Sequence, residues 1–194
     1  TTPPDNGTRI SDGTQKIWLN GHGGSINDPF TTMDFYTSKY WAEIGQPTRF
    51  FAGCALNLNP ADMQSELKNL RRKLKAGADF ILTQPIYDPA LVTNFLSAYE
   101  KENGTLPVPL IVGLLPLASA RHAAFLQSEV PGIEIPRQMH ETMANSGSDG
   151  AHTGIRLTLD LIQQVKPLVQ GIYLMPAFQR YDHAAEIIEG TLKI

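Results

Sequence analysis

Hydrophobic positions alternate between short apolar runs and helical stripes from about residue 50 onward. Apolar runs without a helical stripe predict buried strands, at 50–56, 80–87, 110–115 and 171–175. Between the first two runs, apolar residues repeat at the spacing of one helix face: Met63, Leu67, Leu70 and Leu74. The first three runs begin about 30 residues apart, which is typical of βαβ units and predicts a parallel sheet.

Capping and breaking residues set the expected limits of the helices. Asn59 is expected to cap the first helix, with Pro60 at its first position and Gly77 after its end. Further helices are predicted at 89–103, 119–128, 137–145, 151–169 and 182–192. A short extended segment is expected at 132–136 and a loop at 146–150.

The strands are apolar throughout, which predicts a sheet covered on both faces. A β/α barrel and an open doubly wound sheet both satisfy this pattern. No G-x-G-x-x-G follows a strand, which counts against a dinucleotide-binding open sheet. A whole barrel takes about 250 residues. We therefore expect an α/β fold that is a partial TIM-like (β/α)8 barrel, its C-terminal half to two-thirds, with four clear strands or five if Ile17–Leu19 counts.

The first part of the chain has a different character. Residues 1–15 are rich in Thr, Pro, Gly and Asp and are predicted to be a flexible tail or linker, while 16–194 form the partial barrel. Residues 25–48 are weakly periodic and predict one short helix at most.

Charge and hydropathy narrow the choice of partners and location. The net charge is −3 and no basic stripe runs along the chain, so nucleic acid is not expected as a partner. No apolar stretch approaches the roughly 20 residues that span a bilayer, and the N-terminus is no signal peptide. These features predict a cytoplasmic protein with no membrane partner.

Candidate chemistry lies where barrel strands end, because barrel active sites form at the C-terminal ends of strands. Gln84 follows a mostly apolar strand, and its amide offers a donor and an acceptor that suit the edge of a pterin or flavin ring. A bond to a neighbouring loop is the competing explanation. Other polar residues at strand ends are Asn57, Asn59, Thr83, Ser119, Gln179 and Arg180.

A metal centre is not expected. The single cysteine, Cys54, is predicted to be a buried core thiol, and the five histidines lack metal-ligand spacing. Asp88 is the only carboxylate near a predicted strand end. The run from Asn20 to Gly24, which contains His22, resembles the glycine turn of creatininase-like amidohydrolases, in which the histidine binds metal; a plain glycine-rich turn also explains it.

Three segments together resemble methylenetetrahydrofolate reductases in order and spacing: 69–85, 108–117 and 130–136. The forms of 115–121 and 171–176 resemble the branch fused behind a homocysteine methyltransferase domain. The resemblance covers about 50–194.

The resemblance implies a fold, a reaction and cofactors. It implies an eight-stranded barrel that binds FAD, takes electrons from NADH or NADPH and reduces 5,10-methylenetetrahydrofolate to 5-methyltetrahydrofolate. The resemblance also implies site residues, by their matching positions. Gln84 and Arg180 are expected to bind the folate, and the residues expected to bind the cofactor are Asn59, Asn69, Arg72 and Lys73. Clustered cations on that helix also suit a solvated outer face.

Two parts of the family's site have no clear counterpart. The only candidate place for the family's Gly-Asp pair reads Gly21-His22, and no segment supplies the glutamate of the first strand. The catalytic acid is therefore unknown, and little turnover is expected from the isolated chain.

We expect this chain to be part of a larger reductase. A non-catalytic partial barrel that serves in binding or assembly is the alternative, and a metal-dependent amidohydrolase acting through His22 is a weaker one. Open strand edges predict a homo-oligomer, or pairing with the remainder of the barrel.

Overall fold

The computed structural model of the protein describes residues 51–193. The predictions for the tail 1–15, for Ile17–Leu19, for His22 and for residues 25–48 lie outside the described residues. Two compact units divide the chain, and each is described by itself. Among the described residues, the first comprises 51–54 and Lys68–Asp79, and the second comprises Ala55–Leu67 and 80–193.

A four-stranded sheet has its strands in chain order, β1-β2-β3-β4. The strands are β1 (Gly53–Leu56), β2 (Phe80–Pro85), β3 (Leu110–Leu114) and β4 (Gly171–Leu174). β2 and β3 run parallel with Ile81 opposite Leu110, and β3 and β4 run parallel with Ile111 opposite Gly171. The prediction of an α/β fold with a parallel sheet is confirmed, and consecutive parallel strands are those of a barrel segment.

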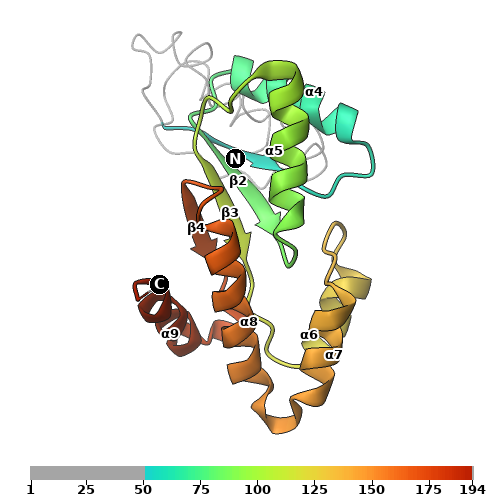
Figure 1. Cartoon of the computed structure of the whole chain (residues 1–194), viewed down its shortest axis with the longest axis vertical. Helices are drawn as coiled ribbons and strands as arrows, with labels where there is room; N and C mark the ends of the chain where they lie inside the picture. The colour runs from blue at the N-terminus through green and yellow to red at the C-terminus, as the bar shows by residue number, and fades with distance from the viewer. Residues whose placement is uncertain (1–50, 194) are drawn as a thin grey trace, which may run out of the picture. The chain divides into compact units, whose positions relative to one another are not determined.

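Helices follow each strand in sequence (Figure 1). They are α4 (Met63–Lys75), α5 (Ala90–Asn103), α6 (Ala120–Glu129), α7 (Arg137–Asn145), α8 (Gly150–Val165) and α9 (Tyr181–Thr191), with short 3₁₀ turns η2 (Gly147–Asp149) and η3 (Ala177–Gln179). α7 contacts both α6 and α8, and α8 contacts α9. The turn η2 occupies the middle of residues 146–150, which were predicted to be a loop.

The predicted cap of the first helix is wrong. α4 begins three residues after Pro60, and the carboxylate of Asp62 caps it by accepting hydrogen bonds from the backbone N–H groups of Gln64 and Ser65, at 3.0 and 3.2 Å. Aspartate is as good a cap as asparagine, and it stands directly before the helix. This leaves the side chain of Asn59 available for a different contact, described below.

The expected cover on both faces of the sheet is found on β3, whereas β1 and β2 expose residues among the described part of the chain. Along β2, Ile81 and Thr83 are buried, whereas Leu82 is 36% exposed and Gln84 is exposed. On β1, Ala55 is exposed. Because side chains alternate between the faces of a strand, the described residues cover one face of β2 and leave the other face open.

A buried cluster fixes the segment between α6 and α7. Its members come from α6, α7, this segment and the strand ends: Tyr87, Leu117, Ala123, Leu126, Ile133, Ile135 and Met143. The hydroxyl of Tyr87 donates to the carbonyl of Leu115 at 2.8 Å, and burial raises the pKa of this phenol. Cys54 is buried, as predicted.

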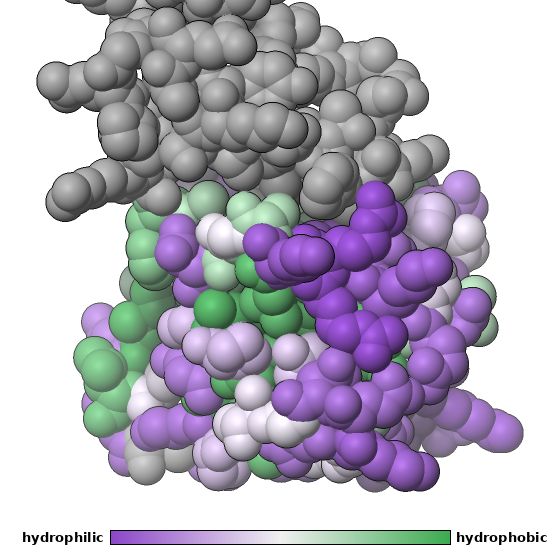
Figure 2. All heavy atoms as spheres, turned by 90° about the horizontal axis from the view of Figure 1, so that it is seen from above, coloured by the Kyte–Doolittle hydropathy of each residue, from purple (hydrophilic) through white to green (hydrophobic). Residues whose placement is uncertain are grey.

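Apolar surface remains outside the core. Seen from above, the described part of the chain shows hydrophilic residues beside areas of apolar side chains (Figure 2). Large exposed apolar side chains are Phe51, Leu82, Phe125, Phe178, Tyr181, Ile188 and Leu192. No helix among residues 51–193 is long and apolar enough to cross a membrane.

Candidate functional site

The ends of β1 and β2 bring three polar side chains to one edge of the sheet. Asn57 and Asn59 follow β1, and Gln84 lies at the end of β2. The backbone N–H of Asn59 donates to the Oδ1 atom of Asn57 at 2.9 Å, and the backbone N–H of Asn57 donates to Glu66 at 3.2 Å. These bonds hold the turn after β1 in a fixed conformation.

The side chains of the loop 130–136 alternate between the buried cluster and the edge of the sheet. Ile133 and Ile135 are buried in the cluster beneath the loop, whereas Gly132 and Glu134 are exposed. In an extended segment, successive side chains point to opposite sides. Because Ile133 and Ile135 point into the cluster, Gly132 and Glu134 face away from it.

The exposed side of the loop meets the strand ends. The Nδ2 group of Asn59 donates to the Oε2 atom of Glu134 at 2.9 Å. Gly132 has a φ of +83°, and a Cβ added there would lie 2.6 Å from Oε1 of Gln84 and 3.7 Å from Nδ2 of Asn57. We call Asn57, Asn59, Gln84 and Glu134 the strand-end cluster. A side chain at position 132 would displace the flexible amide end of Gln84, and the positive φ at this position favours glycine.

Gln84 has unused hydrogen-bonding capacity. Its side-chain amide makes no hydrogen bond with the rest of the described chain, although its backbone carbonyl accepts one from Thr83 at 2.7 Å. The alternative explanation, in which this amide serves a neighbouring loop, therefore finds no support within residues 51–193. The amide oxygen of Gln84 lies beside Gly132.

Glu134 was not found from the sequence. It lies 75 residues from Asn59, and a contact of that range leaves no local signal. The alternation Ile133-Glu134-Ile135 could have suggested that its side chain points away from a buried pair. Asp88, named from the sequence as the only carboxylate near a strand end, instead accepts the backbone N–H of Ala90 at 2.8 Å in the turn before α5.

A tyrosine braces the sheet beneath the strand ends. The hydroxyl of Tyr173 donates to the carbonyl of Thr83 at 2.6 Å, and burial raises the pKa of this phenol. Tyr173 stands opposite Gly113 in the parallel register, and a Cβ on Gly113 would lie 2.7 Å from the tyrosine oxygen. Thr83 in turn accepts the backbone N–H of Gly113 at 3.0 Å. This network, also missed from the sequence, fixes the backbone that carries Gln84.

An apolar hollow of about 460 Å³ lies near the ends of β3 and β4. Its lining residues are Ser119, Arg121, His122, Phe125 and Phe178. The rings of His122 and Phe178 are 5.0 Å apart and inclined by 60°. We call this feature the aromatic hollow.

His122 is held as a neutral acceptor in the wall of the aromatic hollow. Its Nδ1 atom accepts the backbone N–H of Ala118 at 3.2 Å, and burial lowers its pKa from the ordinary value of 6.5. Its own backbone N–H donates to the hydroxyl of Ser119, the cap of α6, at 3.1 Å.

A strained turn brings Phe178 to the aromatic hollow. Phe178 and Gln179 have φ angles of +53° and +60°, in the left-handed region that residues other than glycine seldom adopt. Such strain persists only where the surroundings impose it, and it concentrates at functional sites.

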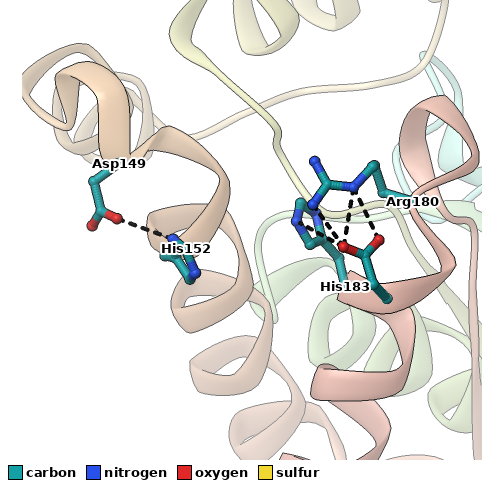
Figure 3. Close-up of polar contacts among 5 residues, drawn as sticks. Asp149, His152, Arg180 and His183 are labelled. Carbon is teal, nitrogen blue, oxygen red and sulfur yellow. Dashed lines mark hydrogen bonds and ion pairs between the residues drawn. The ribbon is translucent and has the colours of Figure 1, made fainter.

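Arg180 follows this turn and forms a two-pronged pair with Asp182 (Figure 3). The Nη2–Oδ2 distance is 2.7 Å and the Nε–Oδ1 distance is 2.9 Å. The hydrogen bonds from Arg180 lower the pKa of the Asp182 carboxyl. Both side chains are exposed, so the pair orients the guanidinium more than it stabilises the fold. A separate pair, His152 with Asp149 at 3.1 Å, lies at the start of α8.

The cofactor residues predicted on α4 share one face of that helix. Asn69, Arg72 and Lys73 stand at positions i, i+3 and i+4. Lys73 is buried, Asn69 is half-buried and Arg72 is exposed. These three residues belong to the first compact unit, whereas the strand-end cluster and Arg180 belong to the second. Their joint use of one cofactor therefore stays a prediction.

A metal centre finds no support in the part of the chain that the structure describes. No group of three or more His, Cys, Asp or Glu side chains is placed to hold an ion among residues 51–193. The amidohydrolase alternative rests on His22, which lies outside that part.

The parallel sheet, with a helix after each strand, defines the chain as a segment of a β/α barrel. The family model of methylenetetrahydrofolate reductase matches residues 51–190, and the chain belongs to this family.

Curated relatives share the family name. The chain is 32% identical over 107 residues to methylenetetrahydrofolate reductase 2 of Saccharomyces cerevisiae, covering 54% of this chain and 17% of the relative. It is 26% identical over 108 residues to methylenetetrahydrofolate reductase 1 of Schizosaccharomyces pombe, covering 54% and 17%. It is 26% identical over 117 residues to methylenetetrahydrofolate reductase (NADH) 1 of Arabidopsis thaliana, covering 58% and 19%. The aligned part is therefore less than a fifth of each relative.

A solved structure shares the fold. An uncharacterized protein from Clostridium thermocellum, described as binding two copies of 5-methyl-5,6,7,8-tetrahydrofolic acid, matches with a TM-score of 0.58 at 20% identity. The match covers 79% of this chain and 57% of that protein.

Proposed function

We propose that this chain supplies the folate-binding strand ends of a flavin-dependent methylenetetrahydrofolate reductase. The complete enzyme would reduce 5,10-methylenetetrahydrofolate to 5-methyltetrahydrofolate with NADH or NADPH. The observation that carries the proposal is the strand-end cluster: Gln84 presents an amide without a protein partner among the described residues, inside the segment that matches the family. The related fold that binds 5-methyltetrahydrofolate supports a folate as the ligand.

Different residues of the chain would bind different parts of a folate. The amide of Gln84 can both donate to and accept from the edge of a pterin ring. The aromatic hollow offers Phe125 and Phe178, which are 56% and 71% exposed, as apolar surfaces for a flat ring. Arg121, in the aromatic hollow, supplies positive charge for the carboxylates of a folate tail, and Arg180 would have to exchange its pair with Asp182 to do the same.

The residues of α4 fit the charged part of FAD. Arg72 and Lys73 are cations on one helix face with the amide of Asn69, a donor set suited to phosphate oxygens. Asn59 belongs to the proposed cofactor side as well. Bound FAD would supply hydride transfer from the nicotinamide to the folate. Cations in the last turn of α4 also complement the helix dipole, so their position alone does not require a ligand.

Proton delivery is the missing part of the mechanism. Reduction of the substrate needs an acid near the pterin, and the catalytic residue remains unknown. We therefore propose that the described part binds and orients the ligands, while other parts of a complete reductase supply the acid. We also propose that the complete reductase is a cytoplasmic protein.

The test is flavin retention and turnover measured on the same preparation. We expect the full 194-residue chain, refolded or expressed with FAD, to keep a flavin absorbance band and to show little reduction of methylenetetrahydrofolate. Turnover similar to that of an intact reductase would contradict our account of the missing acid. Absence of both flavin and folate binding would contradict the proposed function.

A second candidate function, an assembly piece without turnover, is favoured by one observation. An apolar groove of about 470 Å³ runs between β4 and α9. Its lining residues are Ile172, Leu174, Pro176, Tyr181, Ala184, Ile188, Thr191 and Leu192. An edge strand beside exposed apolar side chains is a surface for association.

A further inference from the structure

We propose that Glu134 is the residue that recognises the amino edge of the pterin ring. This inference rests on the proposed folate site and assigns a specificity-determining role within it. The carboxylate belongs to the strand-end cluster through its 2.9 Å hydrogen bond from Asn59.

The geometry places Glu134 on the same side as Gln84. Gly132 lies against the amide of Gln84 and beside Asn57, and Glu134 follows two residues later on the same exposed side of the loop. Ile133 and Ile135 anchor the loop from below, so its exposed side cannot turn inward without unburying both. The carboxylate and the amide therefore form two neighbouring recognition groups at one sheet edge.

The hydrogen-bonding capacity of Glu134 is only partly used. Oε2 accepts from Asn59, whereas no donor among residues 51–193 hydrogen-bonds to Oε1. The bond from Asn59 fixes one oxygen and so limits the orientations that the other can take. A carboxylate held in this way is an acceptor directed at a ligand donor.

The chemistry of a pterin matches this pair of groups. A 2-amino-4-oxo pterin presents two adjacent donors, the ring N3–H and the 2-amino group, next to the acceptor oxygen at position 4. A carboxylate accepts from paired N–H donors with charge-assisted strength. The amide of Gln84 can donate to the adjacent oxygen. The cluster thus distinguishes a pterin from flat rings that lack the amino group.

The experiment compares Glu134→Gln with the wild type by equilibrium titration of the full chain with 5-methyltetrahydrofolate and with its 2-desamino analogue. The substitution keeps the size of the side chain and removes its charge. We expect about tenfold or greater loss of affinity for 5-methyltetrahydrofolate, as for a lost charged hydrogen bond. We expect a smaller loss for the 2-desamino analogue, because it offers this carboxylate only the N3–H donor. Glu141→Gln, an exposed glutamate on α7, is the matched control and should bind like the wild type.

A purely structural role for Glu134 predicts a different result. If Glu134 only fastens the loop, Asn59→Ala and Glu134→Gln should weaken both ligands equally, which would overturn the inference. Equal affinity of Glu134→Gln and wild type for 5-methyltetrahydrofolate would also overturn it. Failure of the wild type to bind either ligand would instead contradict the proposed function itself.

Discussion

At the scale of single residues, Gly132 forms the positive-φ turn that brings the loop beside the strand-end cluster. Gly132 approaches the amide of Gln84 so closely that a Cβ would lie 2.6 Å from its oxygen. The neighbouring Ile133 is buried, so the loop cannot move away without exposing apolar area. The small residue and the buried anchor together determine where Glu134 meets Asn59.

Lys73 provides a test of the cofactor proposal. We expect Lys73→Gln to weaken FAD binding about tenfold or more, because it removes a cation from the proposed phosphate contact. Flavin absorbance after gel filtration across a series of FAD concentrations measures the effect. Lys75→Gln on the same helix is the control, since Lys75 is exposed and lies outside the face shared with Asn69. Equal retention by both variants and the wild type would remove Lys73 from the site.

His122 predicts a pH dependence of stability. Burial lowers its pKa below 6.5, and protonation would also end its acceptance of the N–H of Ala118. The unfolded chain therefore takes up the proton at a higher pH than the folded chain. The free energy of unfolding should fall as pH drops through 6.5 and level off only below the folded-state pKa.

The variant His122→Asn isolates this contribution, because asparagine keeps an acceptor near the position of Nδ1 and does not titrate. Urea unfolding of both proteins between pH 5 and 8 measures it. We expect the difference in stability between wild type and variant to be constant above about pH 7.5 and to shift in favour of the variant toward about pH 5. An unchanged pH profile in the variant would contradict the assignment.

At the scale of elements, the alternation of strands and helices was predictable because burial imposes periodicity on the sequence. The strand at 110–115 became β3 (Leu110–Leu114), and the helix at 137–145 became α7 with the same limits. Errors arose where two residues compete for one role. Asn59 and Asp62 can both cap a helix, and the position directly before α4 decided between them.

The candidate site was partly predictable for the same reason. Gln84 was found because a polar residue interrupts an apolar strand at its end. Glu134 and Tyr173 were missed because their contacts span 75 and 90 residues, and such contacts arise only after the chain has folded.

Glycine in α8 offers a prediction at this scale. A Cβ on Gly154 would collide with the carbonyl oxygen of Leu117, a backbone atom that cannot rotate away. Gly154→Ala should therefore destabilise the protein by about 1–3 kcal/mol in spite of the better helix propensity of alanine.

Gly190→Ala in α9 is the matched control for this substitution. The added Cβ would meet only the flexible end of Leu159, so we expect a change near zero or a small gain. Thermal unfolding of both variants distinguishes the two cases. Equal stability of Gly154→Ala and Gly190→Ala would contradict the close contact between α8 and Leu117.

At the scale of the whole molecule, β4 is the last strand of the sheet among the described residues, and its residues are all half-buried. The adjoining groove carries Tyr181, Ile188 and Leu192, of which Leu192 is 82% exposed. Exposed apolar side chains beside an edge strand favour association with another chain or with further strands of a barrel.

We therefore predict self-association of the isolated chain through this groove. Light scattering across a dilution series should show a concentration-dependent dimer, and Ile188→Glu should shift it to monomer. Ala185→Glu is the control, because Ala185 is exposed on α9 and does not line the groove. A compact, cooperatively unfolding monomer at micromolar concentration in the wild type would contradict the prediction.

The central claim is that the carboxyl edge of this sheet binds a folate through Gln84. Isothermal titration of the full chain with 5-methyltetrahydrofolate tests it most directly, with Gln84→Ala as the variant and Gln163→Ala, an exposed glutamine on α8, as the control. The account predicts saturable binding by the wild type and by Gln163→Ala, and about tenfold or greater weakening in Gln84→Ala. Binding of equal strength in all three proteins, or no binding in any of them, would contradict it.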